Sequence, residues 1–136
     1  MGFGSNLAGR LHGDSRNLFL TGELGSGKTT LLKGVGASLG IRSSEIVSPT
    51  FQLVRRYQGK RGDLIHLDLY RLASIEEILR LGWDELIEDE AVMAVEWAGR
   101  ARLIWPDSGT FVTIEIISEN ERRFTISSNK AGVPGP

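Results

Sequence analysis

The stretch Gly22-Glu-Leu-Gly-Ser-Gly-Lys-Thr29 decides the fold, because it matches the pattern G-x-x-x-x-G-K-[ST] at every fixed position. Its glycines let backbone N–H groups wrap around a phosphate with no Cβ in the way. An apolar run from Asn17 to Thr21 precedes it and predicts a buried strand. Apolar residues at helical spacing follow it and predict a helix from Lys28 to Leu39. The strand, the glycine loop and the helix together predict a site for nucleotide phosphates.

The positions of this loop have expected roles. Lys28 is expected to reach the β and γ phosphates, and the Thr29 hydroxyl to be a ligand of Mg²⁺. The helix that begins near Lys28 directs the positive end of its dipole at the same anion. A chance match in a glycine-rich chain is the alternative, and the strand and helix around the loop argue against it. The residues expected to contact the nucleotide here are Glu23, Leu24, Gly25, Ser26, Gly27, Lys28, Thr29 and Thr30.

The expected nucleotide is ATP. Guanine-specific proteins with this loop carry Asn-Lys-x-Asp, and the only Asn-Lys pair here, Asn129-Lys130, has Gly132 where the Asp would stand. Because that signature is missing, ATP with Mg²⁺ is favoured by default.

Two carboxylates qualify as partners of the magnesium shell, which a site of this kind needs at the end of a neighbouring strand. Asp68 ends the run 63–68, and Glu96 ends the apolar run 91–96. One would hold the metal through water while the other orients the attacking water, and the spacing does not assign the two roles. For each residue the alternative is a surface carboxylate where a strand emerges. Together with Lys28 they form the expected catalytic set, and with Thr29 the expected metal site.

Three further residues have a functional and a structural interpretation. Thr50, in Ser48-Pro-Thr-Phe51, lies where a switch loop would lie and would add a hydroxyl to the metal; read alone, the segment is better explained as a turn. His66 lies two residues before Asp68, on the same strand face, and a histidine there is more often a hydrogen-bonded structural group than a base. Trp97 would pack near the nucleotide or fill the core, and base rates favour the core.

The remaining pattern predicts an α/β protein, a three-layer P-loop NTPase fold with a mixed central sheet and a C-terminal antiparallel hairpin. A capping box at Ser74-Ile-Glu-Glu77 predicts a helix that ends at Leu81. The further strands are expected at 51–57, 64–69, 91–97, 110–118 and 122–127. We expect a partly ordered N-terminal segment at 1–16, a P-loop ATPase domain at 17–128 and a disordered tail at 129–136.

Composition limits the classes of function. The chain of 136 residues has no cysteine, which excludes thiol catalysis and thiolate metal sites. Its net charge of -1 makes autonomous nucleic-acid binding a poor expectation, so DNA is not an expected partner. No apolar run has the length of a signal peptide or a membrane span, and we expect a cytoplasmic protein without membrane contact. The basic group Arg55, Arg56, Lys60 and Arg61 and the acidic stretch 84–90 are expected to be solvated faces.

Read in order, these motifs resemble the bacterial TsaE (YjeE-type) family, small ATPases of tRNA threonylcarbamoyladenosine biosynthesis. A P-loop alone would be shared with many families, but this succession is specific. The motifs that carry the resemblance are Gly22-Glu-Leu-Gly-Ser-Gly-Lys-Thr-Thr30, Ser48-Pro-Thr-Phe-Gln-Leu-Val54 with Tyr57, His66-Leu-Asp-Leu-Tyr-Arg-Leu72 and Val95-Glu-Trp97.

The resemblance implies that the chain binds and hydrolyses ATP and acts with TsaB and TsaD homologues, touching tRNA only through that complex. It further implies phosphate and magnesium contacts for Lys28 and Thr29, the acidic pair for Asp68 and Glu96, and a place by the nucleotide for Trp97. Two other classes stay open: a small-molecule P-loop kinase, although no arginine-rich lid segment is evident, and a nucleotide-gated binding module without turnover.

Overall fold

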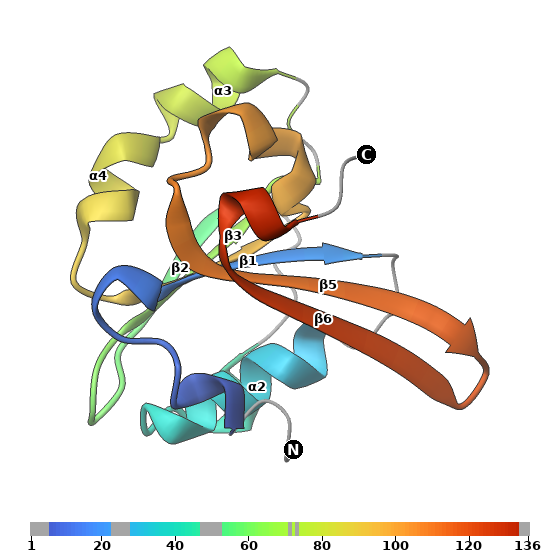
Figure 1. Ribbon diagram of the computed structural model, residues 1–136. Coiled ribbons are helices and arrows are strands. Elements are labelled where there is room, and N and C mark those ends of the chain that lie inside the picture. The colour runs from blue at the N-terminus through green and yellow to red at the C-terminus, as the bar shows by residue number, and fades with distance from the viewer. Residues whose placement is uncertain (1–5, 23–27, 47–52, 71, 73, 134–136) are drawn as a thin grey trace.

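A computed structural model describes residues 6–22, 28–46, 53–70, 72 and 74–133 of this chain, except the side chains of Lys28 and Thr29 (Figure 1). It contains one mixed sheet of six strands in the order β2-β3-β4-β1-β5-β6. In chain order the strands are β1 (Asn17–Gly22), β2 (Val54–Tyr57), β3 (Leu64–Asp68), β4 (Val92–Glu96), β5 (Ser108–Ser118) and β6 (Glu121–Asn129). The four inner strands are parallel to one another, and the outer strands β2 and β6 are antiparallel to their neighbours. This confirms the predicted mixed sheet and closing hairpin.

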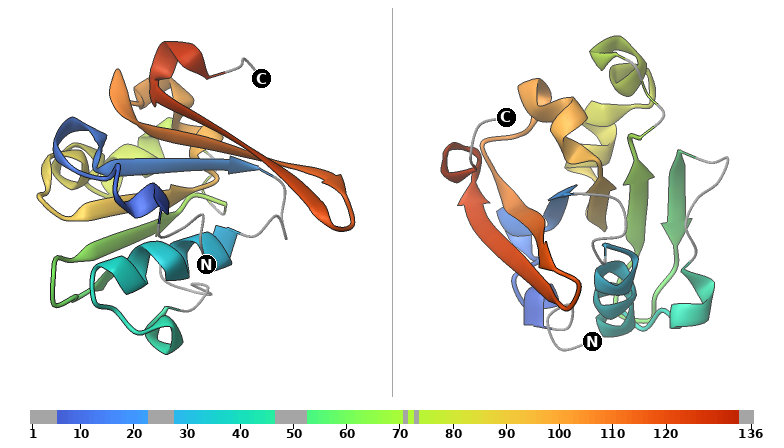
Figure 2. Two further views of the ribbon diagram at one scale, coloured as in Figure 1. Left: turned by 60° about the horizontal axis from the view of Figure 1, so that its bottom comes forward. Right: turned by 90° about the vertical axis from the view of Figure 1, so that its right-hand side faces the viewer.

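Helices cover both faces of the sheet, which makes the three layers (Figures 1 and 2). On one face lies α2 (Lys28–Ser38), and on the other lie α3 (Ile75–Arg80) and α4 (Trp83–Glu88). Short 3₁₀ turns complete the described elements: η1 (Gly13–Ser15), η2 (Ser43–Glu45), η3 (Ala98–Ile104) and η4 (Lys130–Gly132). None of the helices in the described ranges has the length and apolar character needed to cross a membrane.

Strand β1 shows how the sequence builds two cores. Successive side chains of a strand point to opposite faces of the sheet. Leu18 and Leu20 therefore pack with Leu31 and Leu32 of α2, whereas Phe19 packs in the core on the opposite face. The second core is aromatic: the Phe19 ring lies 5.0 Å from Phe111 and 5.9 Å from Trp105, between ring centroids. With both faces covered, the central strand reads as a continuous apolar run.

The β5–β6 hairpin extends beyond the rest of the sheet, as the left view of Figure 2 shows. The register that pairs Phe111 with Ser127 continues outward to Ile116 and Arg122, and after a shift the pairing ends at Ser118 and Glu121. Burial falls along the same path, since residues 115–121 are all exposed. The hairpin therefore begins in the core and ends in solvent.

Two parts of the chain differ from the expectation. The acidic stretch 84–90 is mostly a helix, α4, and the residue that starts it is Gly82 in the left-handed region at φ 89°. Trp83, next in sequence, is only 2% exposed, so the helix is anchored by one buried aromatic side chain. At the C-terminus β6 runs to Asn129, whose side chain accepts a hydrogen bond from the Gly132 amide in η4. The expected tail thus continues as regular structure through Gly132, and residues 134–136 lie outside the described set.

Candidate functional site

The site lies where three parallel strands end at the same edge of the sheet. The register pairs Asp68 at the end of β3 with Glu96 at the end of β4, and pairs Glu96 with Leu20 of β1. Gly22, where the phosphate-binding motif starts, lies two residues further along β1. By the alternation of a strand, Asp68 and Glu96 project to the face that α2 covers, as Leu64 and Ala94 do. The fold therefore brings together the two carboxylates that the sequence analysis selected.

Glu96 is a buried carboxylate with a defined partner. Its residue is only 8% exposed. Its Oε2 atom lies 2.7 Å from Nε2 of His66, which is 2% exposed. Its backbone oxygen also accepts a hydrogen bond from the Leu69 amide at 3.1 Å. Strand β3 therefore holds the side chain of Glu96, and the residue that follows β3 holds its main chain.

Asp68 is held differently, at the surface of the same edge. Its Oδ1 atom accepts a hydrogen bond from the Tyr70 amide at 2.9 Å, so the carboxylate closes the turn after β3. Its own amide donates to the Leu53 carbonyl oxygen at 3.0 Å. Asp68 is half-buried, in contrast to Glu96. The edge thus carries one rigidly held carboxylate and one that faces solvent.

The two carboxylates are chemically suited to magnesium. Each has one oxygen in a hydrogen bond, and the described residues supply no partner for the second oxygen of either. Carboxylate oxygens are ligands that Mg²⁺ prefers, usually one or two per ion with phosphate and water completing the shell. No group of three or more His, Asp or Glu side chains within the described residues forms a metal site on its own. Asp68 and Glu96 therefore fit a metal ion that is also held by a nucleotide.

Trp97, directly after the site, packs against the core on the face that α3 and α4 cover. It adopts a left-handed backbone conformation, φ 56°, directly after Glu96. Its ring lies 4.8 Å from the ring of Tyr70, which is 51% exposed. Arg100 lies over the Tyr70 ring at 5.9 Å and donates from Nη1 to the Leu72 carbonyl oxygen at 3.0 Å. The loops after β3 and β4 are thus joined by ring contacts and by a hydrogen bond.

The remaining predicted site residues stand as follows. Lys28 begins α2, directly after the loop, as predicted. Thr30 is exposed in the first turn of that helix. The predicted nucleotide contacts Glu23, Leu24, Gly25, Ser26, Gly27 and Thr50 lie outside the described residues, and so do the side chains of Lys28 and Thr29. Their roles remain predictions.

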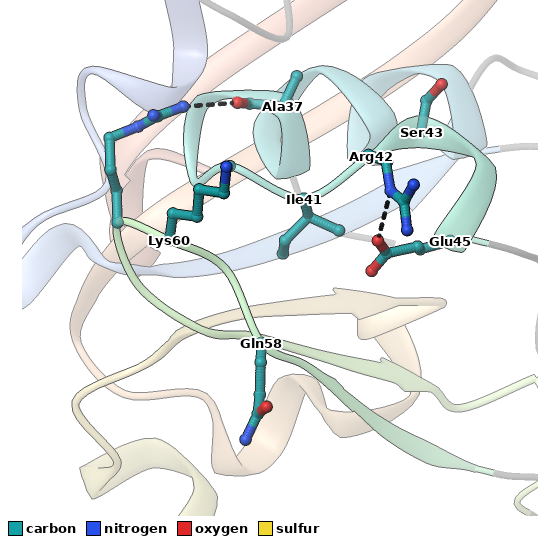
Figure 3. Close-up of a pocket in the computed structure, with 9 residues that line it drawn as sticks. Ala37, Ile41, Arg42, Ser43, Glu45, Gln58 and Lys60 are labelled. Carbon is teal, nitrogen blue, oxygen red and sulfur yellow. Dashed lines mark hydrogen bonds and ion pairs between the residues drawn. The ribbon is translucent and has the colours of Figure 1, made fainter.

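A pocket of about 720 Å³ lies at the opposite end of α2 from the phosphate loop (Figure 3). Its two arginine side chains are bound to oxygen atoms of the protein. Arg61 donates to the carbonyl oxygens of Ser38 and Ala37 at the end of α2, at 2.7 and 3.0 Å, and Arg42 pairs with Glu45 at 3.0 Å. The pocket is therefore distinct from the edge that carries Asp68 and Glu96.

Arg56, in the basic group of the β2–β3 hairpin, forms ion pairs with Asp89 at 2.9 Å and with Asp63 at 3.0 Å. Hydrogen bonds to Asp89 and Asp63 raise the pKa of Arg56, and the Arg56 guanidinium lowers the pKa of Asp89. The basic and acidic segments were expected to be solvated faces. Both segments are partly exposed, but the Arg56–Asp89 ion pair also joins them.

Sequence reasoning missed two features of the site. It favours a hydrogen-bonded structural role for His66 but does not name the partner, which is Glu96. It did not foresee the contact of Tyr70 with Trp97. The motif spacing places His66 and Asp68 on one face, but only the register of β3 against β4 shows which residue of β4 lies within reach.

Comparison with known proteins gives the family. The model of the family described as threonylcarbamoyl adenosine biosynthesis protein TsaE matches residues 1–125. The tRNA threonylcarbamoyladenosine biosynthesis protein TsaE of Treponema pallidum is 35% identical over 121 residues, covering 89% of this chain and 88% of the relative. The protein of the same name from Aquifex aeolicus is 37% identical over 113 residues, covering 82% of this chain and 77% of the relative.

A solved structure agrees in fold. The crystal structure of YdiB from Bacillus subtilis matches with a TM-score of 0.68 and 27% identity, covering 94% of this chain and 80% of that one. The predicted α/β architecture is confirmed by this likeness and by the six-stranded sheet. The family match spans the strands that carry Asp68 and Glu96. This chain therefore belongs to the TsaE family of tRNA threonylcarbamoyladenosine biosynthesis proteins.

Proposed function

We propose that this chain is a Mg²⁺-dependent ATPase that supports threonylcarbamoyladenosine modification of tRNA together with TsaB and TsaD homologues. The observation that carries the proposal is the pairing of Asp68 with Glu96 on adjacent parallel strands, beside the strand that leads into the phosphate-binding motif. Ligands of parallel α/β sheets bind outside the carboxyl ends of the strands. The acidic pair and the motif meet at that edge.

Each residue has a task in this proposal. The backbone of the loop and Lys28 would bind the phosphates, and Thr29 with an acidic residue would hold Mg²⁺. The bound metal ion would neutralise charge that develops on the β and γ phosphates. Of Asp68 and Glu96, one would serve the metal and the other would orient the attacking water. The Trp97 and Tyr70 rings would border the nucleotide.

The near-neutral charge of the chain supports the assignment of tRNA contact to partners. A net charge of -1 gives little of the electrostatic attraction that nucleic-acid binding requires. In the described part of the structure Arg56 and Arg61 are bound to protein oxygens. We therefore assign recognition of tRNA to the TsaB–TsaD complex and nucleotide turnover to this chain.

The test is phosphate release from ATP, with and without Mg²⁺ and with and without TsaB and TsaD. We expect slow release that requires Mg²⁺ and rises when both partners are present. Lys28→Ala should abolish nucleotide binding or turnover, because the lysine supplies charge to the phosphates. Lys33→Ala is the matched control: it removes a lysine from the same helix outside the motif, and it should behave as the unaltered chain.

Other outcomes of this experiment would indicate a different function. Phosphate transferred to a metabolite rather than to water would indicate a small-molecule kinase. Tight ATP binding with no turnover, even with both partners, would indicate a nucleotide-gated binding module. A Lys28→Ala variant with full activity would remove the nucleotide site from this loop.

A further inference from the structure

His66 is a buried polar side chain at the site, and it makes one hydrogen bond to the described residues. It is 2% exposed, and its Nε2 atom lies 2.7 Å from Oε2 of Glu96. Among the described residues its other ring nitrogen, Nδ1, has no hydrogen-bond partner. A buried polar group is costly unless its bonds are made, so the single bond to Glu96 accounts for the presence of a histidine among apolar neighbours.

The sheet register makes this bond a property of the fold. His66 lies beside Ala94, and Glu96 lies beside Asp68, so the imidazole and the carboxylate are two residues apart on neighbouring strands and on one face. The amide of Leu69, the residue directly after β3, donates to the Glu96 carbonyl oxygen at 3.1 Å. The main chain of Glu96 is thus fixed by Leu69 and its side chain by His66.

The protonation of the ring follows from the contact. A carboxylate only accepts hydrogen bonds, so Nε2 must carry the hydrogen that it donates to Glu96. Nδ1 has no hydrogen-bond partner among the described residues, so in that part of the structure the ring is held only through Nε2. The contact therefore assigns a hydrogen to Nε2 of His66.

We propose that His66 is a positioning residue for the ATPase reaction: its Nε2–H group fixes one oxygen of Glu96 and leaves the other directed to the metal or the attacking water. The inference rests on the proposed function. Hydrogen bonds from the surrounding protein orient the carboxylates that serve a metal, and the loss of such a partner costs about 10–100-fold in affinity or activity. His66 itself touches no substrate in this proposal.

Two variants of similar length separate the donor from the bulk. His66→Gln keeps an N–H donor near the position of Nε2, and His66→Met has an unbranched apolar side chain with no donor. We expect His66→Met to lower kcat about 10–100-fold while KM for ATP stays within about twofold, because binding depends mainly on the loop. His66→Gln should recover a large part of the lost rate. Both variants are compared at matched folded fraction, measured by circular dichroism.

A second measurement does not depend on activity. The chain has two histidines, so the ring nitrogens of His66 and the exposed His12 are easily told apart in a long-range ¹H–¹⁵N spectrum. We expect His66 to carry its hydrogen on Nε2, with that proton shifted downfield by the carboxylate, and Glu96→Ala to remove the shift. His66→Met should lower the urea midpoint more in the wild-type background than in the Glu96→Ala background. Only the wild-type background has a His66–Glu96 hydrogen bond that the substitution can remove.

The outcomes are distinct. A His66 ring with hydrogen on Nδ1, or a spectrum unaffected by Glu96→Ala, would overturn the inference at the level of the bond. An active wild-type chain whose His66→Met variant turns over equally fast would overturn positioning while leaving the ATPase proposal intact. A wild-type chain that releases no phosphate with Mg²⁺ and both partners would overturn both. Equal loss of kcat in His66→Met and His66→Gln would show a packing role and would also overturn positioning.

Discussion

At the scale of single residues, Asp68 and Glu96 differ in how tightly the fold holds them. Glu96 is buried and bonded to His66, whereas Asp68 is half-buried and closes a turn through the Tyr70 amide. A carboxylate that is fixed before the nucleotide arrives needs no reorganisation in the transition state. Loss of Glu96 should therefore affect the chemical step more than the binding step.

We expect Glu96→Ala to bind ATP while its turnover collapses, by at least about a hundredfold if the carboxylate orients water or metal in the transition state. Nucleotide binding is measured by calorimetry and turnover by phosphate release. Asp68→Ala is measured in parallel. Comparison of the two variants shows which carboxylate changes the Mg²⁺ dependence of turnover and which changes kcat alone. Turnover in Glu96→Ala equal to that of the unaltered chain would remove Glu96 from the chemistry.

That Asp68 and Glu96 each end a strand could be predicted from sequence, because a carboxylate at the end of an apolar run marks the end of a strand. The contacts between site residues could not be predicted in this way. That His66 bonds Glu96 and that Tyr70 contacts Trp97 depends on the register of β3 with β4 and on the left-handed conformation at Trp97. Neither quantity has a local sequence signal, since both arise when distant segments pack.

At the scale of elements, the turn between β2 and β3 packs directly on the end of α2. The Arg61 amide donates to the Leu39 carbonyl oxygen at 2.9 Å, and the Arg61 guanidinium binds the Ser38 carbonyl oxygen. Gly59 permits this approach, because a Cβ there would collide with the backbone oxygens of Gly62 and Leu39. Backbone atoms cannot rotate away as side chains do.

Gly59→Ala should therefore destabilise the protein by about 1–3 kcal/mol, the usual cost of forcing extra volume into a packed contact. Urea unfolding followed by circular dichroism gives the free energy of unfolding. Gly9→Ala serves as the control, because its Cβ would meet only the Asn6 carbonyl oxygen at an ordinary 3.5 Å. Equal stability of Gly59→Ala and the unaltered chain would show that the turn can move away from α2.

The Arg56–Asp89 ion pair connects the β2–β3 hairpin to the segment between α4 and β4. Hydrogen bonds from Arg56, and then from the Ala91 amide, lower the pKa of Asp89 below its ordinary value of 3.8. A carboxyl group with a lowered pKa in the folded state stabilises the protein above its unfolded pKa, and that contribution is lost as pH falls through the folded pKa. Both side chains are partly exposed, 48% for Arg56 and 29% for Asp89, which limits the effect.

Asp89→Asn should lower the free energy of unfolding by about 0.2–1 kcal/mol at pH 7, the range of partly exposed pairs. The difference between the variant and the unaltered chain should shrink as pH falls below about 4, where the carboxyl group protonates. Urea unfolding across this pH range measures it. Glu90→Gln, the neighbouring exposed carboxylate, should show neither the loss nor its pH dependence; a difference that stays constant with pH would contradict the role of the charge.

Most elements could be predicted from the sequence, and the main exception is α4. Strands with apolar runs and the helix opened by the Ser74 capping box were recognisable, and the Glu77 amide donates to the Ser74 hydroxyl as that pattern requires. Helix α4 is short and rich in acidic residues, so its pattern resembled a solvated face. Its place is set by the left-handed Gly82 and by Trp83, whose indole donates to the Ile104 carbonyl oxygen at 3.1 Å. That partner lies in a distant segment, beyond the reach of local pattern.

At the scale of the whole molecule, the β5–β6 hairpin projects from one small α/β domain, as the left view of Figure 2 shows. If nucleotide state governs association with the TsaB–TsaD pair, capture of this chain by the immobilised pair should be stronger with ATP than with ADP. Lys28→Ala should abolish that difference, because it removes nucleotide binding. Equal capture under all conditions would separate partner binding from the nucleotide. Quantitative pull-down measures the captured amount.

The central position of β1 also has a consequence for the order in which the chain can fold. Leu18 of β1 pairs with Ala94 of β4 on one side and with Thr110 of β5 on the other. Both neighbours of the first strand therefore come from the second half of the sequence. Bringing such distant segments together costs chain entropy before any contact repays it. During synthesis the strand that leads into the phosphate motif emerges early, yet it gains its lateral partners only when β4 and β5 have left the ribosome. Assembly of the proposed site around β1 is therefore a late event, completed only after β4 and β5 have been made.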